Sequence, residues 1–218
     1  MAEQNKEIEL KGIGVSPGVA VGPVFLLTND EDRLVERDIS EDDIPREIAR
    51  FEEALIATRY QIHEIQQKVG QAIGQKSASI FDAHLLVVDD RAFVEEVIRG
   101  LGVQRKNVEA VLSSVANRYA QALAELKDDY LRERAADVRD VTRRILRNLS
   151  GQSSVQLSQL DKACILIAND LSPSDTATLN KSKVIGFATD LGSHTSHTAI
   201  MARALEIPAV VGLHDVSV

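Results

Sequence analysis

The residue types best suited to chemistry in this chain are two histidines in a short polar run. Residues 192–198 read Gly-Ser-His-Thr-Ser-His-Thr, and the residues that follow repeat apolar side chains at helical spacing. A hydroxyl of Ser196 or Thr195 can cap that helix by accepting a hydrogen bond from a free backbone amide. His197 then lies in the first turn, where unpaired N–H groups and the positive end of the helix dipole favour an anion. Because the same amides stabilise a phosphoryl group on the imidazole, the run predicts phosphoryl transfer through a phosphohistidine.

Two other interpretations fit the same run. A histidine beside serine and threonine at a helix start often serves only as a polar capping residue. His194 and His197 are three residues apart, a spacing at which two metal ligands can share one helix face. His194, however, is expected before the helix, and no third ligand stands nearby. The sequence therefore predicts no metal site and leaves the capping interpretation open beside catalysis.

The run is expected near the end of a small layered domain. After residue 151, short apolar segments typical of buried strands alternate with short helical patterns. Ser172 and Pro173 open one of these helices as N-cap and first helical residue, a position where proline is tolerated. Residues 9–27 mix β-favouring residues with Gly and Pro, which predicts a pair of short strands around a turn. The later strands are predicted at 163–168, 183–189 and 207–212.

The middle of the chain carries a different, helical pattern. From Ser40 onward, apolar residues recur at spacings of three, four and seven, as on the buried face of an amphipathic helix. Ser40 and Asp43 form a capping pair at the start of the first helix. Short connections between several such helices predict an antiparallel bundle. The helices are predicted at about 40–70, 77–88, 91–101, 108–126 and 135–149.

The predicted fold class is therefore an α/β domain interrupted by an antiparallel α-helical bundle. Residues 1–27 are expected to return and pack on residues 151–218, so that both ends of the chain build one domain. Residues 28–150 form the helical insertion.

Composition excludes several classes of function. The net charge of −8, the scattered basic residues and the absence of tryptophan argue against nucleic-acid binding. No apolar run approaches the roughly 20 residues of a membrane span, and the polar start differs from a signal peptide. Cys164 is the single cysteine and lies in an apolar run, so it is interpreted as a small buried hydrophobe. A chain without disulfides fits the cytoplasm.

The region around His197 resembles a known phosphohistidine signature. Residues 195–212, Thr-Ser-His-Thr-Ala-Ile-Met-Ala-Arg-Ala-Leu-Glu-Ile-Pro-Ala-Val-Val-Gly, are similar to that of enzyme I of the phosphoenolpyruvate-dependent sugar phosphotransferase system. Swivelling domains of phosphoenolpyruvate synthase and pyruvate phosphate dikinase share only this region. Further segments resemble enzyme I in the same order, at residues 12–18, 80–84, 129–140 and 171–176. The resemblance thus covers nearly the whole chain and implies a swivelling phosphohistidine domain.

The resemblance implies a role for each residue of the site. His197 is the residue phosphorylated at the expense of phosphoenolpyruvate, and it passes the group to a histidine of HPr, the small phosphocarrier protein. Thr176 matches a position whose hydroxyl bonds the active imidazole, and Thr195 and Ser196 support the phosphate. His194 stands where many relatives have arginine, which makes phosphate stabilisation depend on its protonation.

In enzyme I the helical part docks HPr, and the resemblance assigns the matching positions here. An apolar centre with a charged rim is the usual pattern of such an interface. The predicted HPr-binding residues are His84, Leu86, Val87, Asp90, Phe93, Leu123, Leu131 and Arg134. Some of these positions are expected to belong to the core, and the sequence does not show which.

Enzyme I relatives continue into a C-terminal barrel that binds phosphoenolpyruvate and magnesium. This chain is therefore expected to be a monomeric fragment, truncated within its phosphohistidine domain and without a cofactor of its own. It should exchange phosphoryl groups with HPr but fail to use phosphoenolpyruvate alone. Two alternatives remain at this point: a swivelling domain of a synthase or dikinase, and a non-catalytic module that binds HPr. The sequence does not distinguish sugar uptake from a nitrogen-linked phosphorelay.

Overall fold

The structure is a computed structural model in which the chain forms two compact units. One unit falls within residues 1–28 and 156–218, and the other within residues 29–155. The residues that the structure describes are 8–27, 36–151, 160, 162–177, 179–194 and 196–217.

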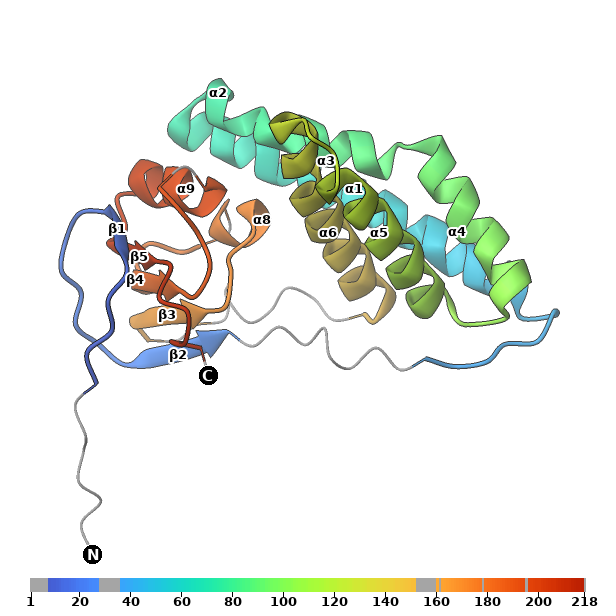
Figure 1. Ribbon diagram of the computed structural model, residues 1–218, viewed down its shortest axis with the longest axis horizontal. Helices are drawn as coiled ribbons and strands as arrows, with labels where there is room; N and C mark the ends of the chain where they lie inside the picture. Colours follow the sequence, from blue (N-terminus) through green and yellow to red (C-terminus); the bar gives the residue numbers. More distant parts are fainter. Residues whose placement is uncertain are drawn as a thin grey trace, which may run out of the picture. The chain divides into compact units, whose positions relative to one another are not determined.

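The first unit is built on a five-stranded sheet with the order β1-β5-β4-β3-β2 (Figure 1). The strands β2, β3, β4 and β5 run parallel to one another, and β1 is antiparallel to β5 at one edge. Two helices, α8 and α9, alternate with the last three strands, as expected for a parallel sheet. The bounds are β1 Ile13–Ser16, β2 Val24–Leu27, β3 Cys164–Ala168, α8 Pro173–Ala177, β4 Val184–Thr189, α9 His197–Leu205 and β5 Ala209–Val211.

The strands near the N-terminus form as predicted, but they do not form a pair. β1 bonds β5 and β2 bonds β3, so the two strands lie at opposite edges of the sheet. The expectation of a strand pair was wrong because residues 17–23 join the two strands in place of a two-residue hairpin turn, so the connection does not force them to bond each other. Leu26 of β2 is opposite Ile167 of β3, which shows that the two ends of the chain build one sheet.

One face of the sheet packs against α9 around a common apolar core. Ala199 and Ala202 of α9 are fully buried, and their small side chains let the helix approach the strands closely. The core of this unit comprises Val15, Leu166, Ala168, Leu171, Leu179, Val184, Phe187, Ala199, Ala202, Ile207, Ala209 and Val211. This packing fixes the start of α9 relative to the ends of the strands.

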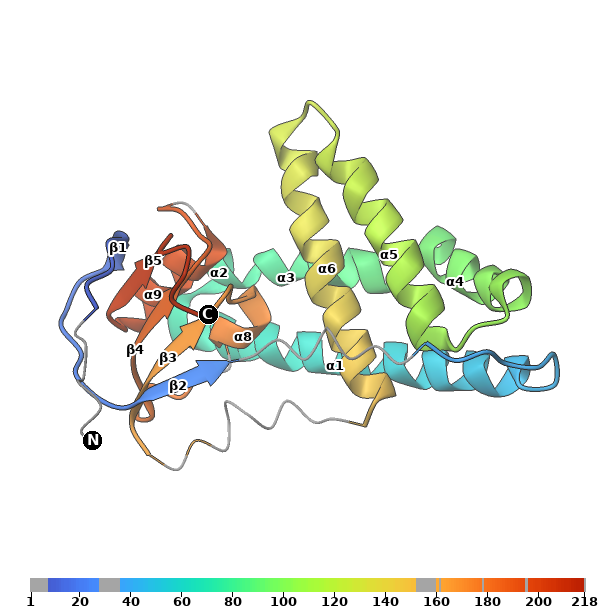
Figure 2. The same cartoon turned by 60° about the horizontal axis from the view of Figure 1, so that its bottom comes forward.

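The second unit is helical throughout its regular part. The helices α5 and α6 form an antiparallel hairpin, and α6 also packs on α1 and α3 (Figure 2). None of the helices in the described part of the chain is long and apolar enough to cross a membrane. The bounds are α1 Ile44–Ile73, α2 Gln75–Ala78, α3 Ile80–Val88, α4 Arg91–Gln104, α5 Val108–Ala124 and α6 Asp129–Leu149.

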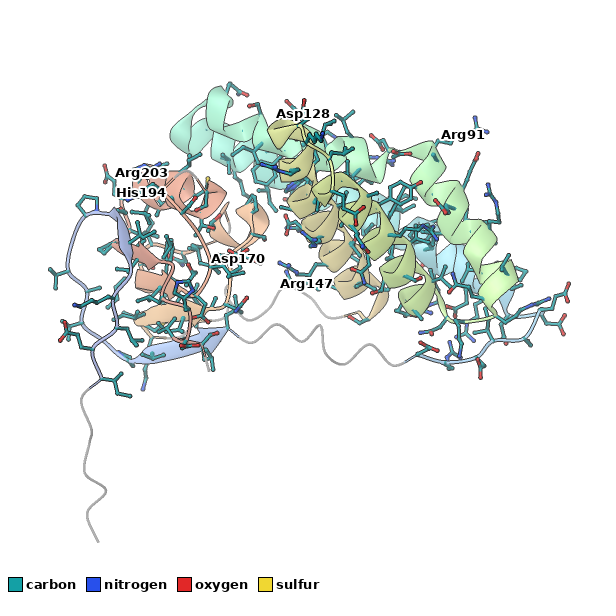
Figure 3. The ribbon with its side chains drawn as sticks, viewed as in Figure 1. Arg91, Asp128, Arg147, Asp170, His194 and Arg203 are labelled. Carbon is teal, nitrogen blue, oxygen red and sulfur yellow. The ribbon has the colours of Figure 1, made fainter. Side chains whose placement is uncertain are left out.

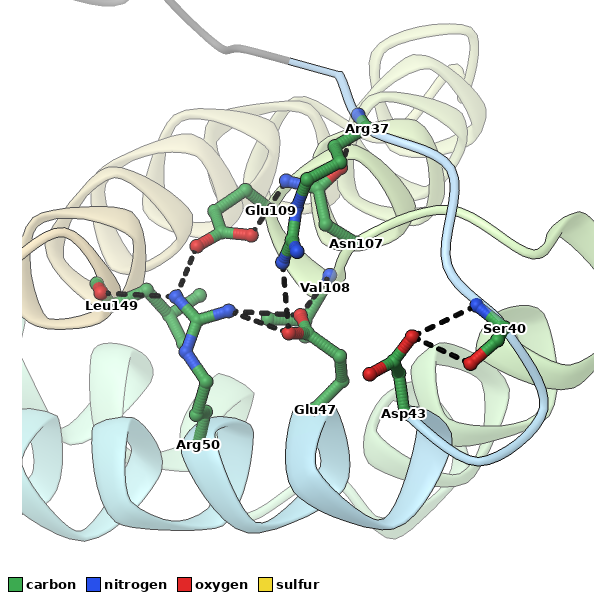
Figure 4. A network of polar contacts seen from close by, with 9 residues as sticks. All are labelled: Arg37, Ser40, Asp43, Glu47, Arg50, Asn107, Val108, Glu109 and Leu149. Atoms are coloured by element: carbon green, nitrogen blue, oxygen red, sulfur yellow. Dashed lines mark hydrogen bonds and ion pairs between the residues drawn. The ribbon is translucent and has the colours of Figure 1, made fainter.

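A polar network joins α1, α5 and the end of α6 (Figure 4). The buried Glu47 carboxylate accepts hydrogen bonds from the Arg50 guanidinium at 2.9 Å and from the backbone N–H of Val108 at 2.9 Å. Arg50 also binds Glu109 at 2.5 Å and donates to the carbonyl of Leu149 at 3.3 Å. Because Val108 is the first residue of α5, Glu47 satisfies a free amide at that helix start from another helix. The network therefore fixes three helix ends to one another.

Candidate functional site

The predicted site lies where the neighbouring parallel strands β3 and β4 end. Parallel strands bring their carboxyl ends to the same edge of a sheet, and loops at that edge commonly carry ligand sites. The backbone N–H of Asp190 donates to the carbonyl of Ala168 at 3.2 Å, and that of Leu191 donates to the carbonyl of Asn169 at 2.9 Å. The loop after β4, which carries His194 and leads to His197, is thereby bonded to the loop after β3.

The helix α9 starts as the sequence predicts. Ser196 is its N-cap, with an extended backbone, and its hydroxyl accepts a hydrogen bond from the N–H of Ala199 at 3.3 Å. The same hydroxyl donates to the carbonyl of Ser193 at 2.9 Å. His197 is the first helical residue. Thr195 and the side chain of His197 lie outside the described residues.

The base of the loop needs a residue without a side chain at Gly192. Its φ of +124° lies in the region that favours glycine, and a Cβ there would stand 2.9 Å from the Cβ of Val211. The hydroxyl of Thr189 donates to the carbonyl of Leu191 at 2.6 Å. The loop is therefore held tightly against β5 before it reaches His194.

Asp190 binds the segment that follows β5 and was not singled out by the sequence. Its buried carboxylate accepts hydrogen bonds from the N–H of Val216 at 2.5 Å, from the N–H of Ser217 at 3.2 Å and from the Ser217 hydroxyl. Burial alone would raise the pKa of Asp190, but these bonds and one from Asn169 outweigh it and hold the pKa below the usual value. Asp190 is thus an ionised anchor two residues before Gly192.

A permanent positive charge reaches the loop from within α9. The Arg203 guanidinium donates to the carbonyl of His194 at 3.4 Å and to the carbonyl of Val15 at 3.3 Å (Figure 3). The imidazole of His194 is exposed. Arg203 is therefore a fixed cation at the backbone of this loop, and the sequence analysis did not single it out.

The start of α8 shows the predicted cap and the predicted threonine. The Ser172 hydroxyl accepts from the N–H of Asp175 at 3.1 Å, and the Asp175 carboxylate accepts from the N–H of Ser172 at 3.2 Å. Thr176 is fully buried, and its hydroxyl lies 3.0 Å from the carbonyls of both Ser172 and Pro173. A hydroxyl has one proton, so that of Thr176 is committed to the backbone and its oxygen is left to accept.

The predicted HPr-binding positions divide into exposed and buried residues. Leu86 on α3 is 72% exposed and Leu131 on α6 is 39% exposed, while Asp90 is exposed and caps α4. His84 and Phe93 are each only 1% exposed, so they are the members of the predicted set that belong to the core of the helical unit. The three half-buried positions are Val87, Leu123 and Arg134.

His84 is buried between two carboxylates of α6. Its Nε2 lies 3.3 Å from Asp137 and its Nδ1 lies 3.5 Å from Asp140, and both aspartates are buried. Neither ring nitrogen makes a hydrogen bond of good geometry with them, so the residues are in close contact without a hydrogen bond. Arg134 pairs with Asp137 at 2.9 Å. The cluster holds α3 on α6.

The other reactive groups do not gather into a metal centre. Across the described ranges, no group of three or more histidine, cysteine, aspartate or glutamate side chains is placed to hold a metal ion. Burial raises the pKa of the Cys164 thiol, which agrees with its interpretation as a small hydrophobe in β3.

Comparison with known proteins identifies the class to which this fold and site belong. A family model described as PEP-utilising enzyme, N-terminal, matches residues 11–134. A second, described as PEP-utilising enzyme, mobile domain, matches residues 160–218. The chain belongs to the family of PEP-utilising enzymes.

Individual relatives and solved structures show which members of this family the chain resembles. Phosphoenolpyruvate-protein phosphotransferase of Haemophilus influenzae is 38% identical over 95% of this chain, and that of Listeria monocytogenes is 39% identical over 96%. The chain spans 36% of the length of each of these relatives. A solution structure of enzyme I (nEIt) is 44% identical, with a TM-score of 0.77 over 96% of this chain and 84% of that one. An N-terminal domain of Enzyme 1 - Nitrogen is 25% identical, with a TM-score of 0.69 over 94% of this chain and 83% of that one.

Proposed function

We propose that this chain relays phosphoryl groups through His197, from phosphoenolpyruvate in the parent protein to the histidine of HPr. The observation that supports this most directly is a histidine at the capped start of α9 in a PEP-utilising family member. The relatives named phosphoenolpyruvate-protein phosphotransferase support the same reaction.

The proposed reaction requires aligned reactants and positive charge near the phosphoryl group, and it needs no covalent intermediate on another side chain. In the exchange with HPr, the P–N bond of one phosphohistidine breaks as a P–N bond to the other imidazole forms, and no other group is transferred. Such transfers depend on in-line approach, exclusion of water and preorganised positive charge. The free amides and the dipole at the start of α9 supply part of that charge next to His197.

Thr176 and His194 are proposed to tune the imidazole. Because the Thr176 hydroxyl gives its proton to the backbone, its oxygen can accept an N–H from a neutral imidazole and leave the other nitrogen free to attack phosphorus. His194, exposed beside the helix start, adds a positive charge when it is protonated, and Thr195 and Ser196 complete the phosphate support.

HPr is proposed to dock on one surface of the helical unit. We call this the docking surface and define it, without the buried His84 and Phe93, by the side chains that are at least partly exposed. It has apolar and charged members, as protein interfaces have. The docking surface comprises Leu86, Val87, Asp90, Leu123, Leu131 and Arg134.

The finer predictions from the sequence belong to the same proposal. The α/β unit is proposed to act as a swivelling domain into which the helical unit is inserted. Phosphoenolpyruvate and magnesium are proposed to bind residues of the parent protein outside this chain, which then exchanges phosphoryl groups as a monomer. The cytoplasm is the proposed location.

The test is phosphoryl exchange with phosphorylated HPr. The purified chain is mixed with it, and intact mass and peptide mapping are used to find an acid-labile, base-stable adduct. We expect the adduct on His197 and none in a His197→Ala variant. Phosphate on His194 would move the active residue, and binding of HPr without phosphate would favour a binding module.

Two further measurements separate docking from chemistry. A Leu86→Asp variant should weaken HPr binding and leave the adduct obtainable at high HPr concentration, since His197 is untouched. Incubation with phosphoenolpyruvate alone should give no adduct, and phosphoryl uptake in that experiment would contradict the division of roles within the parent protein.

A further inference from the structure

Thr198, the residue after His197, makes a buried hydrogen bond to a different element. Its side chain is 3% exposed, and its hydroxyl donates to the carbonyl of Leu171 at 2.7 Å. Leu171 is itself buried in the loop between β3 and α8. This bond therefore joins the first turn of α9 to the start of α8.

A threonine hydroxyl in a helix commonly donates to a backbone carbonyl of the same helix, but the Thr198 hydroxyl does not. Thr142 in α6 does so: its buried hydroxyl donates to the carbonyl of Val138, four residues earlier, at 2.7 Å. Thr198 stands in the first turn of α9 and has no helical carbonyl four residues before it. Its bond instead spans 27 residues of sequence.

From Leu171 the chain leads directly to the other predicted partner of the imidazole. Leu171 is followed by Ser172, whose carbonyl accepts both the N–H and the hydroxyl of Thr176 at 3.0 Å. A short path of buried bonds thus runs from the residue after His197 to the hydroxyl proposed to hold the imidazole. The length of this path limits how far α8 and α9 can separate.

We propose that Thr198 is a positioning residue that sets the place of His197 relative to Thr176. The inference rests on the proposed phosphoryl transfer at His197. Phosphoryl transfer depends strongly on alignment, and a shift of about 1 Å can lower a rate by roughly a hundredfold. A hydroxyl that fixes two helix starts therefore acts on rate rather than on partner binding.

The test removes the hydroxyl and keeps the shape of the side chain. Thr198→Val deletes the bond, Thr198→Ser keeps the hydroxyl, and Thr142→Val deletes a buried hydroxyl with the same bond length in the other unit. Single-turnover transfer from phosphorylated HPr is measured over a range of HPr concentrations and pH. For Thr198→Val we expect a roughly tenfold or larger fall in the maximal rate, an unchanged half-saturating HPr concentration and a displaced pH profile. Thr198→Ser should restore both the rate and the profile, and Thr142→Val should leave them as in the original chain.

Each other outcome overturns the assignment. Suppose that the unsubstituted chain takes phosphate but Thr198→Val transfers it at the same rate, or Thr198→Ser is no faster than Thr198→Val. Either result shows that the hydroxyl does not position His197. Equal losses in Thr198→Val and Thr142→Val show a general loss of stability instead. An original chain that takes no phosphate removes the proposed function and this role together. If Thr198→Val fails to fold, Thr198→Ala gives the same comparison with a smaller side chain.

Discussion

The buried Glu47 carboxylate offers the sharpest test of what stabilises the helical unit. It accepts two bonds of 2.9 Å from Arg50, one of 2.9 Å from the Val108 N–H and one of 3.3 Å from Arg37 (Figure 4). Its side chain is 3% exposed, whereas that of Arg50 is 29% exposed. The substitution Glu47→Gln keeps the size and removes the charge, so it isolates the electrostatic part of this network.

The expected loss follows from the partners that remain. Breaking a fully buried ion pair costs about 3–5 kcal/mol, because the remaining charge is left without compensation. Arg50 keeps its bond to Glu109 and is partly solvated, so the loss should be smaller. The glutamine amide also brings donors against a guanidinium and a backbone N–H that are donors themselves. We expect Glu47→Gln to lower the free energy of unfolding by about 2–3 kcal/mol.

Tyrosine fluorescence follows the helical unit selectively. The chain has no tryptophan and three tyrosines, at positions 60, 119 and 130, all within the unit of residues 29–155. Urea unfolding followed by this signal should show a midpoint lowered by about 1–2 M with an unchanged slope. The control is Glu53→Gln, an exposed glutamate of the same helix, which should stay within about 0.5 kcal/mol of the original chain.

Two results would refute this reasoning. A loss below about 1 kcal/mol would mean that desolvation of Glu47 cancels its attraction to Arg50, as happens for some buried pairs. Additive effects of Glu47→Gln and Arg50→Met would mean that the two side chains are not energetically coupled, although they are in contact.

Three further changes test other contacts. Ser196→Ala removes the cap of α9, and losing such a cap costs ~1 kcal/mol of helix stability. Amide hydrogen exchange in the first turn of α9 should therefore become about fivefold faster. An unchanged exchange rate would show that the cap does not stabilise the helix. The low pKa of Asp190 means that its carboxylate stabilises the fold above about pH 4 and that this stabilisation is lost as pH falls through the lower native pKa. The melting-temperature gap between the original chain and Asp190→Asn should therefore narrow at acid pH, and a gap that stays constant from pH 7 to 3 would contradict the assignment. His84→Leu removes the imidazole that lies within 3.5 Å of the Asp137 and Asp140 carboxylates, while the ion pair from Arg134 to Asp137 remains. Tyrosine fluorescence should then show the free energy of unfolding of the helical unit lowered by about 1–3 kcal/mol. A loss under about 0.5 kcal/mol would show that the ring does not stabilise this cluster.

Apolar periodicity and capping residues predicted most helices and strands, because these elements are determined by residues close together in the sequence. The strand around Cys164 and the helix capped by Ser196 were found where apolar period and capping residues placed them. The sixth helix begins at Asp129 rather than near 135, because its first two turns carry several charged residues and Leu131, which continues the apolar stripe, is 39% exposed. Asp128 caps it by accepting from the N–H of Leu131, a short-range signal that periodicity does not detect.

The contacts of the site were less predictable because they join distant residues. The sequence placed His197 in a first helical turn, but the bond from Thr198 to Leu171 and the reach of Arg203 to Val15 depend on how strands and helices pack. Burial is also a property of packing: Phe93 and Leu86 look alike in an apolar pattern, yet one is in the core and the other is exposed.

The position of the helical unit within the chain has a simple topological reason. The strands β2 and β3 are adjacent and parallel, with Val24 opposite Ile165 and Leu27 opposite Ala168. Parallel neighbours cannot be joined by a tight turn, so the chain must return to the far end of the sheet through a crossover. Here the crossover contains the whole unit of residues 29–155. Because the entropy of closing a loop grows only slowly with its length, a large folded unit can occupy this connection at little cost to the sheet. The same connection lets one chain carry the proposed phosphohistidine site and the proposed docking surface without interrupting the strands that position His197.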